Sequence, residues 1–244
     1  RRLGLPMTPQ LALRSRAALP PASGELRCGV AILGSGVAGL TAAWRLAREG
    51  RRDIVLIDGP EPDGNAAGST LGGTACPRGA HYLPLPDPGL AHVRELLADL
   101  GVLTGGLRDD APEYDEQALV HPAAERTLAD GIWHEGLLPT STAADAAAAV
   151  RFSADMTAWS ARRGDDGRPA FALPLAASSG DPALRALDRQ TFSRWLDDAG
   201  HTHPPLRHYI DYAMRDDYGA RPDTVSAWAG LHYFASRHGF HAPG

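Results

Sequence analysis

Three glycines set two and three positions apart form the pattern in this chain that points most directly to chemistry. Gly34, Gly36 and Gly39 read G-x-G-x-x-G. Such spacing allows a tight turn, the close approach of a pyrophosphate to the backbone, and close packing of a helix on a strand. Asp58 follows Gly39 by 19 positions, where a carboxylate can accept hydrogen bonds from a ribose. The four residues predict a dinucleotide site.

The residues between these glycines belong to the same predicted site. Phosphates would rest on the free N–H groups at a helix N-terminus, where the helix dipole favours negative charge. Ser35, Val37 and Ala38 occupy these positions. Ser35 is interpreted as a small residue contacting phosphate, because the turn is not the G-x-S-x-G of a nucleophilic serine. A close-packed turn without a ligand is the alternative.

The flanking segments supply the elements that position such a turn. Residues 26–33 form an apolar run typical of a buried parallel strand, and residues 53–58 form a second run of strand length. Residues 37–49 between them have helical spacing, with Gly50 where a helix would end. The fold class is therefore α/β, with a Rossmann-like βαβ unit for FAD or NAD(P).

The segment after the second strand favours the flavin dinucleotide over the nicotinamide one. Residues 59–88 are rich in glycine and proline, and we expect an ordered irregular loop there rather than further βα units. A glycine-studded loop lets the backbone approach a large buried ligand closely. An NAD(P)-dependent dehydrogenase, which would continue with regular strand and helix alternation, remains the alternative.

With these motifs the sequence resembles the flavin-containing amine oxidases and related FAD-dependent oxidoreductases. That family has a glycine pair, usually followed by arginine, shortly after the ribose-binding acid; here Asp63-Gly64-Asn65 stands at that place. Asp63 replaces a glycine and Asn65 an arginine. Arg78 is a candidate for the missing positive charge, and Gly72-Gly73 is an alternative position for the pair.

The resemblance extends to two further segments. Gly79-Ala80-His81-Tyr82 matches a family segment that passes near the flavin, which makes Gly79, Ala80 and His81 candidate cofactor residues. His81 could form a hydrogen bond with the flavin or the substrate. Equally, it could be an ordinary loop residue whose side chain bonds to the backbone. Residues 212–239 are similar to a bacterial branch of these oxidoreductases.

The resemblance implies an FAD cofactor and a small-molecule substrate that gives a hydride to the flavin. Family members are much longer, and no second glycine-rich flavin segment follows here, so we expect an N-terminal part of such an enzyme. Residues 1–25 would form an arm, residues 26–88 the FAD-binding half-domain, and residues 89–244 an incomplete, helix-rich substrate region. A non-catalytic dinucleotide-binding fragment is a further alternative. No catalytic residue is assigned.

Composition excludes several other classes of function. The net charge is −5, which gives no broad footprint for nucleic acid. Every basic residue is arginine, so Schiff-base lysines and a P-loop are absent from this sequence. No apolar run is long enough for an integral membrane segment. No apolar core of an export signal follows the opening Arg1-Arg2 pair.

The region from residue 89 onward is predicted to be mostly helical. Glycine follows most of the expected segments, Ser141 or Thr142 would cap the second, and Asp223 would cap the last. The expected helices cover residues 89–100, 141–150, 191–199, 206–218 and 224–237.

Several polar and aromatic residues there are interpreted as structural. His201 and His203 have a spacing compatible with a metal on a strand, but a solvent-exposed loop is the favoured interpretation. His232, His238 and His241 are expected at the surface or at a helix end. Asp216-Asp217 would pair with Arg215 or Arg221. Four tryptophans are expected in the core: Trp133, Trp159, Trp195 and Trp228.

Overall fold

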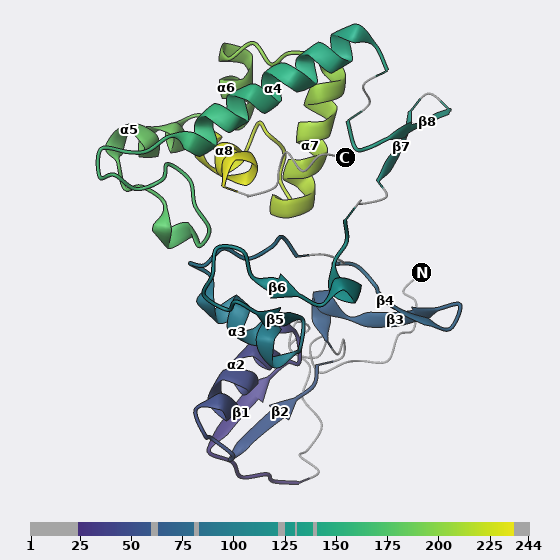
Figure 1. The fold of residues 1–244 in the computed structure, drawn as a ribbon, viewed down its shortest axis with the longest axis vertical. Coiled ribbons are helices and arrows are strands. Elements are labelled where there is room, and N and C mark those ends of the chain that lie inside the picture. Colours follow the sequence, from purple (N-terminus) through teal and green to yellow (C-terminus); the bar gives the residue numbers. More distant parts are fainter. Residues whose placement is uncertain are drawn as a thin grey trace, which may run out of the picture. The chain divides into compact units, whose positions relative to one another are not determined.

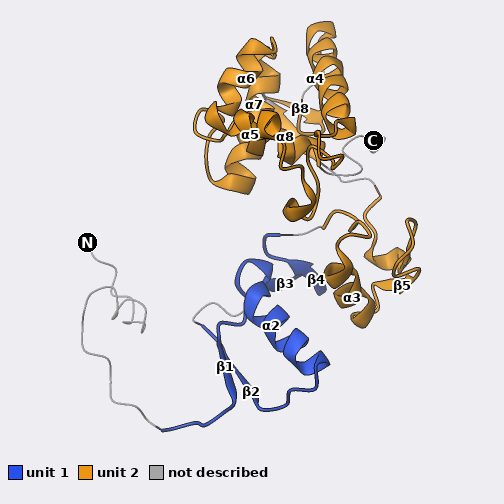
Figure 2. Cartoon of the chain, turned by 90° about the vertical axis from the view of Figure 1, so that its left-hand side faces the viewer, with its two compact units in different colours: residues 1–82 blue, residues 83–244 orange. Residues whose placement is uncertain are grey.

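The computed structural model describes residues 24–59, 63–80, 83–121, 125–129, 131–138 and 141–236. The chain divides into two compact units, residues 1–82 and residues 83–244, which Figure 2 colours separately. Each unit is described by itself below.

The first unit is built on the predicted strand–helix–strand segment. Strand β1 (Val30–Leu33) pairs in parallel with β2 (Ile54–Ile57), with Val30 opposite Ile54 and Leu33 opposite Ile57. Helix α2 (Val37–Arg48) joins them (Figure 1). A parallel pair needs such a crossover connection, because its two strands run in the same direction. The Rossmann-like α/β fold class is confirmed.

The two strands are less buried than the sequence predicted. Leu33 is 79% exposed and Ile57 is 45% exposed. No hydrophobic residue that the structure describes between positions 24 and 80 is buried. The physical reason is the size of this sheet: two strands covered by one helix leave a face and both edges open, whereas larger parallel sheets are covered on both faces.

The glycine-rich segment after β2 is more regular than the predicted irregular loop. A short 3-10 helix η1 (Gly64–Ala66) precedes a hairpin of β3 (Gly68–Leu71) and β4 (Thr74–Pro77). Gly72 and Gly73 form its two-residue turn, and both have positive φ (58° and 84°). A two-residue turn that matches the twist of the hairpin strands requires positive φ at both positions. Gly72-Gly73, the alternative position of the cofactor glycine pair, thus serves as a hairpin turn, and its contact with a cofactor stays a prediction.

The second unit begins with a small α/β segment. Helix α3 (Ala91–Asp99) is followed by β5 (Leu103–Gly105), β6 (Glu113–Tyr114) and η2 (Glu116–Ala118). The hairpin of β7 (Arg126–Ala129) and β8 (Ile132–Glu135) comes next. Helix α3 confirms the helix predicted over residues 89–100.

Helices make up the rest of the second unit (Figure 1). They are α4 (Ala143–Ala161), α5 (Pro182–Arg185), α6 (Phe192–Asp198), α7 (Pro204–Tyr218) and α8 (Ala227–Ala235), with the 3-10 segments η3 (Leu175–Ala177) and η4 (Ala186–Arg189). Their shared core contains Phe152, Met156, Phe192, Ile210 and Leu231, each at most 2% exposed. This core gives the helical part its stability by burying apolar surface.

Local signals explain where these helices begin and end. The Thr142 side chain accepts from the Asp145 N–H, and Asp145 accepts in return from the Thr142 N–H, a capping box. Thr142 is thus the predicted cap of α4, although the helix runs to Ala161 rather than to residue 150. Its extension places Phe152 and Met156, four positions apart, on the buried face.

The start of α8 differs from the prediction. Ser226, not Asp223, caps this helix and accepts from the Ala229 N–H at 3.2 Å. Val225 cannot join the helix, because its N–H bonds to Arg221 and its carbonyl accepts from the Phe192 N–H at 2.8 Å. These tertiary contacts override the local sequence preference.

Candidate functional site

The predicted dinucleotide turn lies between the end of β1 and the start of α2. Gly34 has φ 97°, a conformation that favours glycine, and its N–H bonds to the Ile57 carbonyl at 2.7 Å. Gly36 is the N-cap of α2, and no side chain caps this end. The first N–H groups of the helix, including those of Val37 and Ala38, thus have no capping side chain and can receive an anion.

The third glycine lets the helix come close to the turn. A Cβ on Gly39 would lie 1.9 Å from the Gly34 carbonyl oxygen and 3.3 Å from Cγ2 of Ile32. No side chain fits at the first distance without moving the backbone. The structure therefore places Gly39 in the role that the spacing predicted for it.

The segment at residues 63–65 lies directly against this turn. The Asp63 N–H donates to Oγ of Ser35 at 3.3 Å, and Ser35 is buried, at 4% exposed. A Cβ on Gly64 would lie 3.4 Å from Cα of Gly36. Two glycine backbones thus meet with no side chain between them, so the segment that the family resemblance singled out closes on the glycine turn.

Asp63 adopts a backbone conformation that suits the glycine it replaces. Its φ is 64°, in the left-handed region. Aspartate tolerates this region better than most residues, but glycine enters it at no steric cost. The resemblance pattern, which has glycine here, agrees with the observed conformation.

Asp58 follows β2 directly, at the same edge as the glycine turn. Its side chain is exposed and has no hydrogen-bond or ion-pair partner within the described part of the chain. The backbone bond between Gly34 and Ile57 keeps the residue before Asp58 beside the turn. A free carboxylate here can accept bonds from a ribose.

The second predicted cofactor segment lies partly within the described residues. A Cβ on Gly79 would be 3.8 Å from the Asn65 carbonyl oxygen, so the two candidate segments are neighbours. Ala80 is exposed, as is Arg78, whose N–H bonds to Ala67. His81 falls outside the described residues.

The histidines at 201 and 203 do not lie in a solvent-exposed loop, as the sequence predicted. His201 is 1% exposed and its Nε2 lies 2.8 Å from Oδ2 of Asp155, on α4. His203 is partly buried and bonds to Asp145 at 2.7 Å. Each histidine therefore joins the segment after α6 to α4 through a carboxylate. Sequence spacing missed this because the partners are 46 and 58 positions away.

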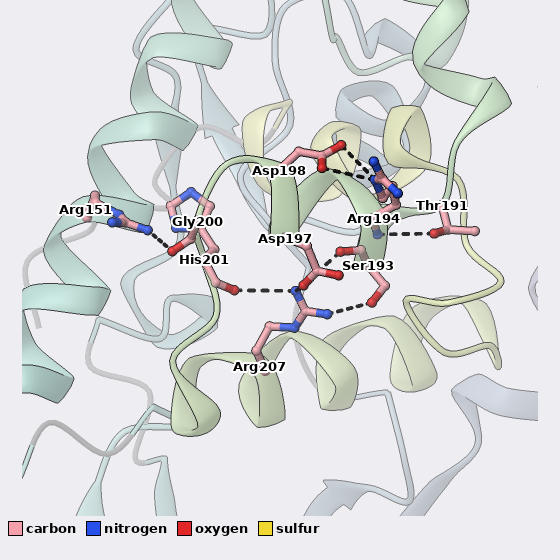
Figure 3. A network of polar contacts seen from close by, with 9 residues as sticks. All are labelled: Arg151, Thr191, Ser193, Arg194, Asp197, Asp198, Gly200, His201 and Arg207. Carbon is pink, nitrogen blue, oxygen red and sulfur yellow. Dashed lines mark hydrogen bonds and ion pairs between the residues drawn. The ribbon is translucent and has the colours of Figure 1, made fainter.

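An arginine network holds the loop that carries His201 (Figure 3). Arg207 donates to Oγ of Ser193 at 2.6 Å, to Oδ1 of Asp197 at 3.0 Å and to the His201 carbonyl at 3.4 Å. Arg151 of α4 donates to the Gly200 carbonyl. The loop is thus fixed from both sides.

Burial and hydrogen bonding set the charge states of the two pairs. Burial lowers the pKa of His201, and its hydrogen bond to the Asp155 carboxylate opposes this effect. The hydrogen bond from His203 lowers the pKa of Asp145, with Thr142 acting in the same direction. Nδ1 of His201 is buried with no hydrogen-bond partner among the described residues, and its ring contacts those of Phe152 and Trp195. We interpret the pairs as structural, because each joins α4 to the segment after α6.

The remaining candidates divide between core and surface. Trp159, Trp195 and Trp228 pack against the helical core, as predicted. Trp133 is 63% exposed on β8, where Arg126 lies over its ring, so its placement in the core was wrong.

Two further predictions for the helical part can be compared with the structure. His232 is buried and bonds to the Ala172 carbonyl at 2.9 Å rather than lying at the surface, but it stands in the last turn of α8, so the expected helix end is correct. Arg215 and Arg221 both pair with Asp211, and their pairing with Asp216-Asp217 stays a prediction. His238 and His241 lie outside the described residues.

One buried charge was not anticipated from the sequence. Arg94 on α3 is 2% exposed and donates to the carbonyls of Pro86, Leu107 and Asp109. An arginine in an amphipathic helix is usually expected at the surface, and nothing in the local sequence indicates that Arg94 is buried. Its partners lie in loops that only the fold brings together.

The described residues were also compared with the requirements of a metal site and of a membrane-spanning helix. In the described ranges, no three histidine, cysteine or acidic side chains gather in a way that could hold a metal ion. Over the same ranges, no helix combines the length and apolarity needed to cross a bilayer.

Comparisons with known proteins agree with the glycine turn. Residues 32–100 match the family model of the NAD(P)-binding Rossmann-like domain. No curated protein sequence matches the chain. Among solved structures, wild-type putrescine oxidase bound to putrescine matches with a TM-score of 0.52 and 19% identity, over 84% of this chain and 41% of that chain. The chain thus shares its fold with the matched part of that structure.

A second structure gives the same result. A triple mutant from a redesign of cofactor binding in putrescine oxidase matches with a TM-score of 0.52 and 19% identity, over 84% of this chain and 40% of that one. The chain thus spans about two fifths of the length of these structures. The fold that the family resemblance implied is found over that part of these structures.

Proposed function

We propose that this chain is the FAD-binding N-terminal part of an oxidoreductase of the amine-oxidase type. The observation that carries the proposal is the closure of residues 63–65 on the glycine turn, through Ser35 and Asp63 and through Gly36 and Gly64. A phosphate turn alone suits any dinucleotide. A second glycine segment beside it offers backbone to a longer cofactor.

The residues of the first unit fit the ADP half of FAD. The N–H groups at the start of α2, around Val37 and Ala38, would hold the pyrophosphate in a backbone concavity that a side chain would fill. Asp58 would accept from the ribose. Arg78 has no side-chain partner among the described residues and would supply the positive charge that Asn65 does not.

The residues farther along would line the rest of the cofactor. Gly64 with Asn65, and Gly79 with Ala80 and His81, would present backbone and short side chains along it. When bound, FAD supplies a hydride acceptor for oxidation of a small-molecule C–N or C–C bond. In this proposal residues 26–88 form the FAD-binding half-domain and residues 89–244 contribute to a substrate region.

An NAD(P)-dependent dehydrogenase is the second candidate. The family model over residues 32–100 describes an NAD(P)-binding domain, and the turn and Asp58 suit that cofactor as well. Against it, β2 is followed by a 3-10 helix and an antiparallel hairpin rather than by another parallel strand. A nicotinamide domain of regular construction would continue its parallel sheet there.

Competition between cofactors distinguishes the candidates. The chain is titrated with FAD and with NAD⁺, and bound FAD is then challenged with ADP or with FMN. We expect FAD to bind about tenfold tighter than NAD⁺, a difference of about 1.4 kcal/mol. ADP, which shares the half held by the turn, should displace FAD, and FMN should not. Tighter binding of NAD⁺ would favour the dehydrogenase.

A further inference from the structure

The second unit contains a cavity in its helical part. Its volume is about 580 Å³, and its walls come from residues 168–180, from α5 with η4, and from Trp228 at the start of α8. Figure 1 shows α5 and the chain before it beside α8. None of these residues belongs to the dinucleotide turn.

One wall is aromatic and rigid. The indole of Trp228 stacks on His232, with ring centroids 5.1 Å apart and an interplanar angle of 19°. Phe171 meets the same indole edge-on at 5.4 Å. Since Phe171 is buried in the core, the exposed part of the indole offers a fixed apolar surface. Leu175, 59% exposed, adds a second apolar group.

The backbone N–H groups of Ser179 and Gly180, which also line the cavity, already have partners. The Ser179 N–H donates to the Pro169 carbonyl and the Gly180 N–H donates to Asp166. The hydroxyl of Ser179 donates to Asp166 as well. These groups shape the cavity but leave no donor for a ligand.

Three arginines line the cavity, and two of them have no partner in the described part of the chain. Arg168 donates to the Ala176 carbonyl. Arg185 and Arg189 are exposed, line the cavity, and have no hydrogen-bond or ion-pair partner in the described part of the chain. With Asp188 as the one acidic lining residue, the lining carries an excess of positive charge.

We propose that this cavity binds a small organic anion. Arg185 and Arg189 hold its carboxylate or similar group, and Trp228 with Leu175 packs against its apolar or aromatic part. Guanidinium groups bind carboxylates through paired charge-assisted hydrogen bonds, and a cavity that is apolar with a few charged groups is typical of a small-molecule site. The inference does not depend on the identity of the dinucleotide.

Fluorescence titration with 2-naphthoate, against its neutral analogue 2-naphthamide, tests the proposal. We expect 2-naphthoate to bind at least about tenfold tighter than the amide, since the charged group contributes the arginine contacts. The double variant Arg185→Gln/Arg189→Gln should lose about tenfold or more. Arg194→Gln removes an exposed arginine that lies outside the cavity lining, and it should leave binding unchanged.

Three results would overturn the proposal. They are equal binding of the acid and the amide, an unchanged affinity in the double variant, and displacement of 2-naphthoate by inorganic phosphate at equal concentration, which would mean that the apolar wall is not used. Circular dichroism establishes that the variants are folded. Should the double variant not fold, added sodium chloride must weaken 2-naphthoate binding to the unmodified chain, because salt screens exposed charges.

Discussion

The N–H of Asp63 donates to Oγ of Ser35 at 3.3 Å, across 28 positions of sequence. This bond joins the glycine turn to the segment where the amine-oxidase resemblance expected a glycine pair. Because Ser35 is buried, its hydroxyl is an acceptor that water cannot easily replace. The relationship leads to the first prediction.

Ser35→Ala should weaken both the first unit and its binding of FAD. Ser35 Oγ is the acceptor of the Asp63 N–H within the described part of the chain, and its removal should cost about 1 kcal/mol, measured by urea unfolding. Asp63→Gly should do the opposite, because glycine adopts φ 64° without strain. A loss of stability in Asp63→Gly as large as that in Ser35→Ala would show that the backbone conformation is not the cause.

Arg94 should be necessary for the segment that contains α3. Arg94→Met leaves the carbonyls of Pro86, Leu107 and Asp109 without their donor, at a cost of about 3 kcal/mol. Arg94→Lys should not restore stability, since an ammonium lacks the fork geometry of guanidinium. Arg108→Met, at an exposed position, is the matched control. Thermal unfolding measures all three, and a stable Arg94→Met variant would contradict the assignment.

Gly230→Ala should destabilise the helical core. The new Cβ would lie 2.3 Å from Cγ and Cδ1 of Phe192, and overpacking of this kind costs about 1–3 kcal/mol. Gly59→Ala, where no atom lies within 4 Å, should change little. The free energies of unfolding in urea decide the matter, and equal values for the two variants would count against this packing.

The stability of the second unit should depend on pH through His201. Burial lowers the pKa of His201 below its ordinary value of 6.5, so the unfolded chain binds the proton more readily than the folded one. Its contribution is therefore present above about pH 6.5 and declines as the pH falls below that value. Unfolding in urea at about pH 7.5 and about pH 5 should show the decline.

The variant His201→Phe should reduce that pH dependence. Phenylalanine fits between the rings of Phe152 and Trp195 and has no proton to bind, while Asp155, whose side chain is 45% exposed, can be hydrated. His92→Gln, at an exposed position, should retain the dependence. An undiminished pH effect in His201→Phe would assign it to another group.

The sequence predicted those features that local pattern controls. The glycine turn, α2 and the parallel strands followed from spacing and apolar runs, and the cap at Thr142 followed from its residue type. What it missed depends on tertiary contacts. His201 is buried because Phe152 and Trp195 pack against its ring, and a carboxylate of α4, 46 positions earlier, bonds to its Nε2.

The errors at Trp133 and Ser226 have similar causes. Trp133 has apolar neighbours in sequence, but a two-stranded hairpin leaves it 63% exposed. Asp223 is a good capping residue, but it lies within a turn at residues 222–224, and the bond from the Phe192 N–H to the Val225 carbonyl delays the helix start until after Ser226. The candidate cofactor residues Asn65, Gly79 and Ala80 belong to the same unit as the glycine turn. Their contacts with FAD stay a prediction.

Binding of FAD to Gly39→Ala, compared with Gly24→Ala, tests most directly whether the turn at residues 34–39 holds this cofactor. A Cβ at position 39 would lie 1.9 Å from the Gly34 carbonyl oxygen, whereas nothing lies within 4 Å of one at position 24. We expect Gly39→Ala to lower the affinity for FAD by about tenfold or more and Gly24→Ala to leave it unchanged. Equal affinities of both variants for FAD would contradict the account.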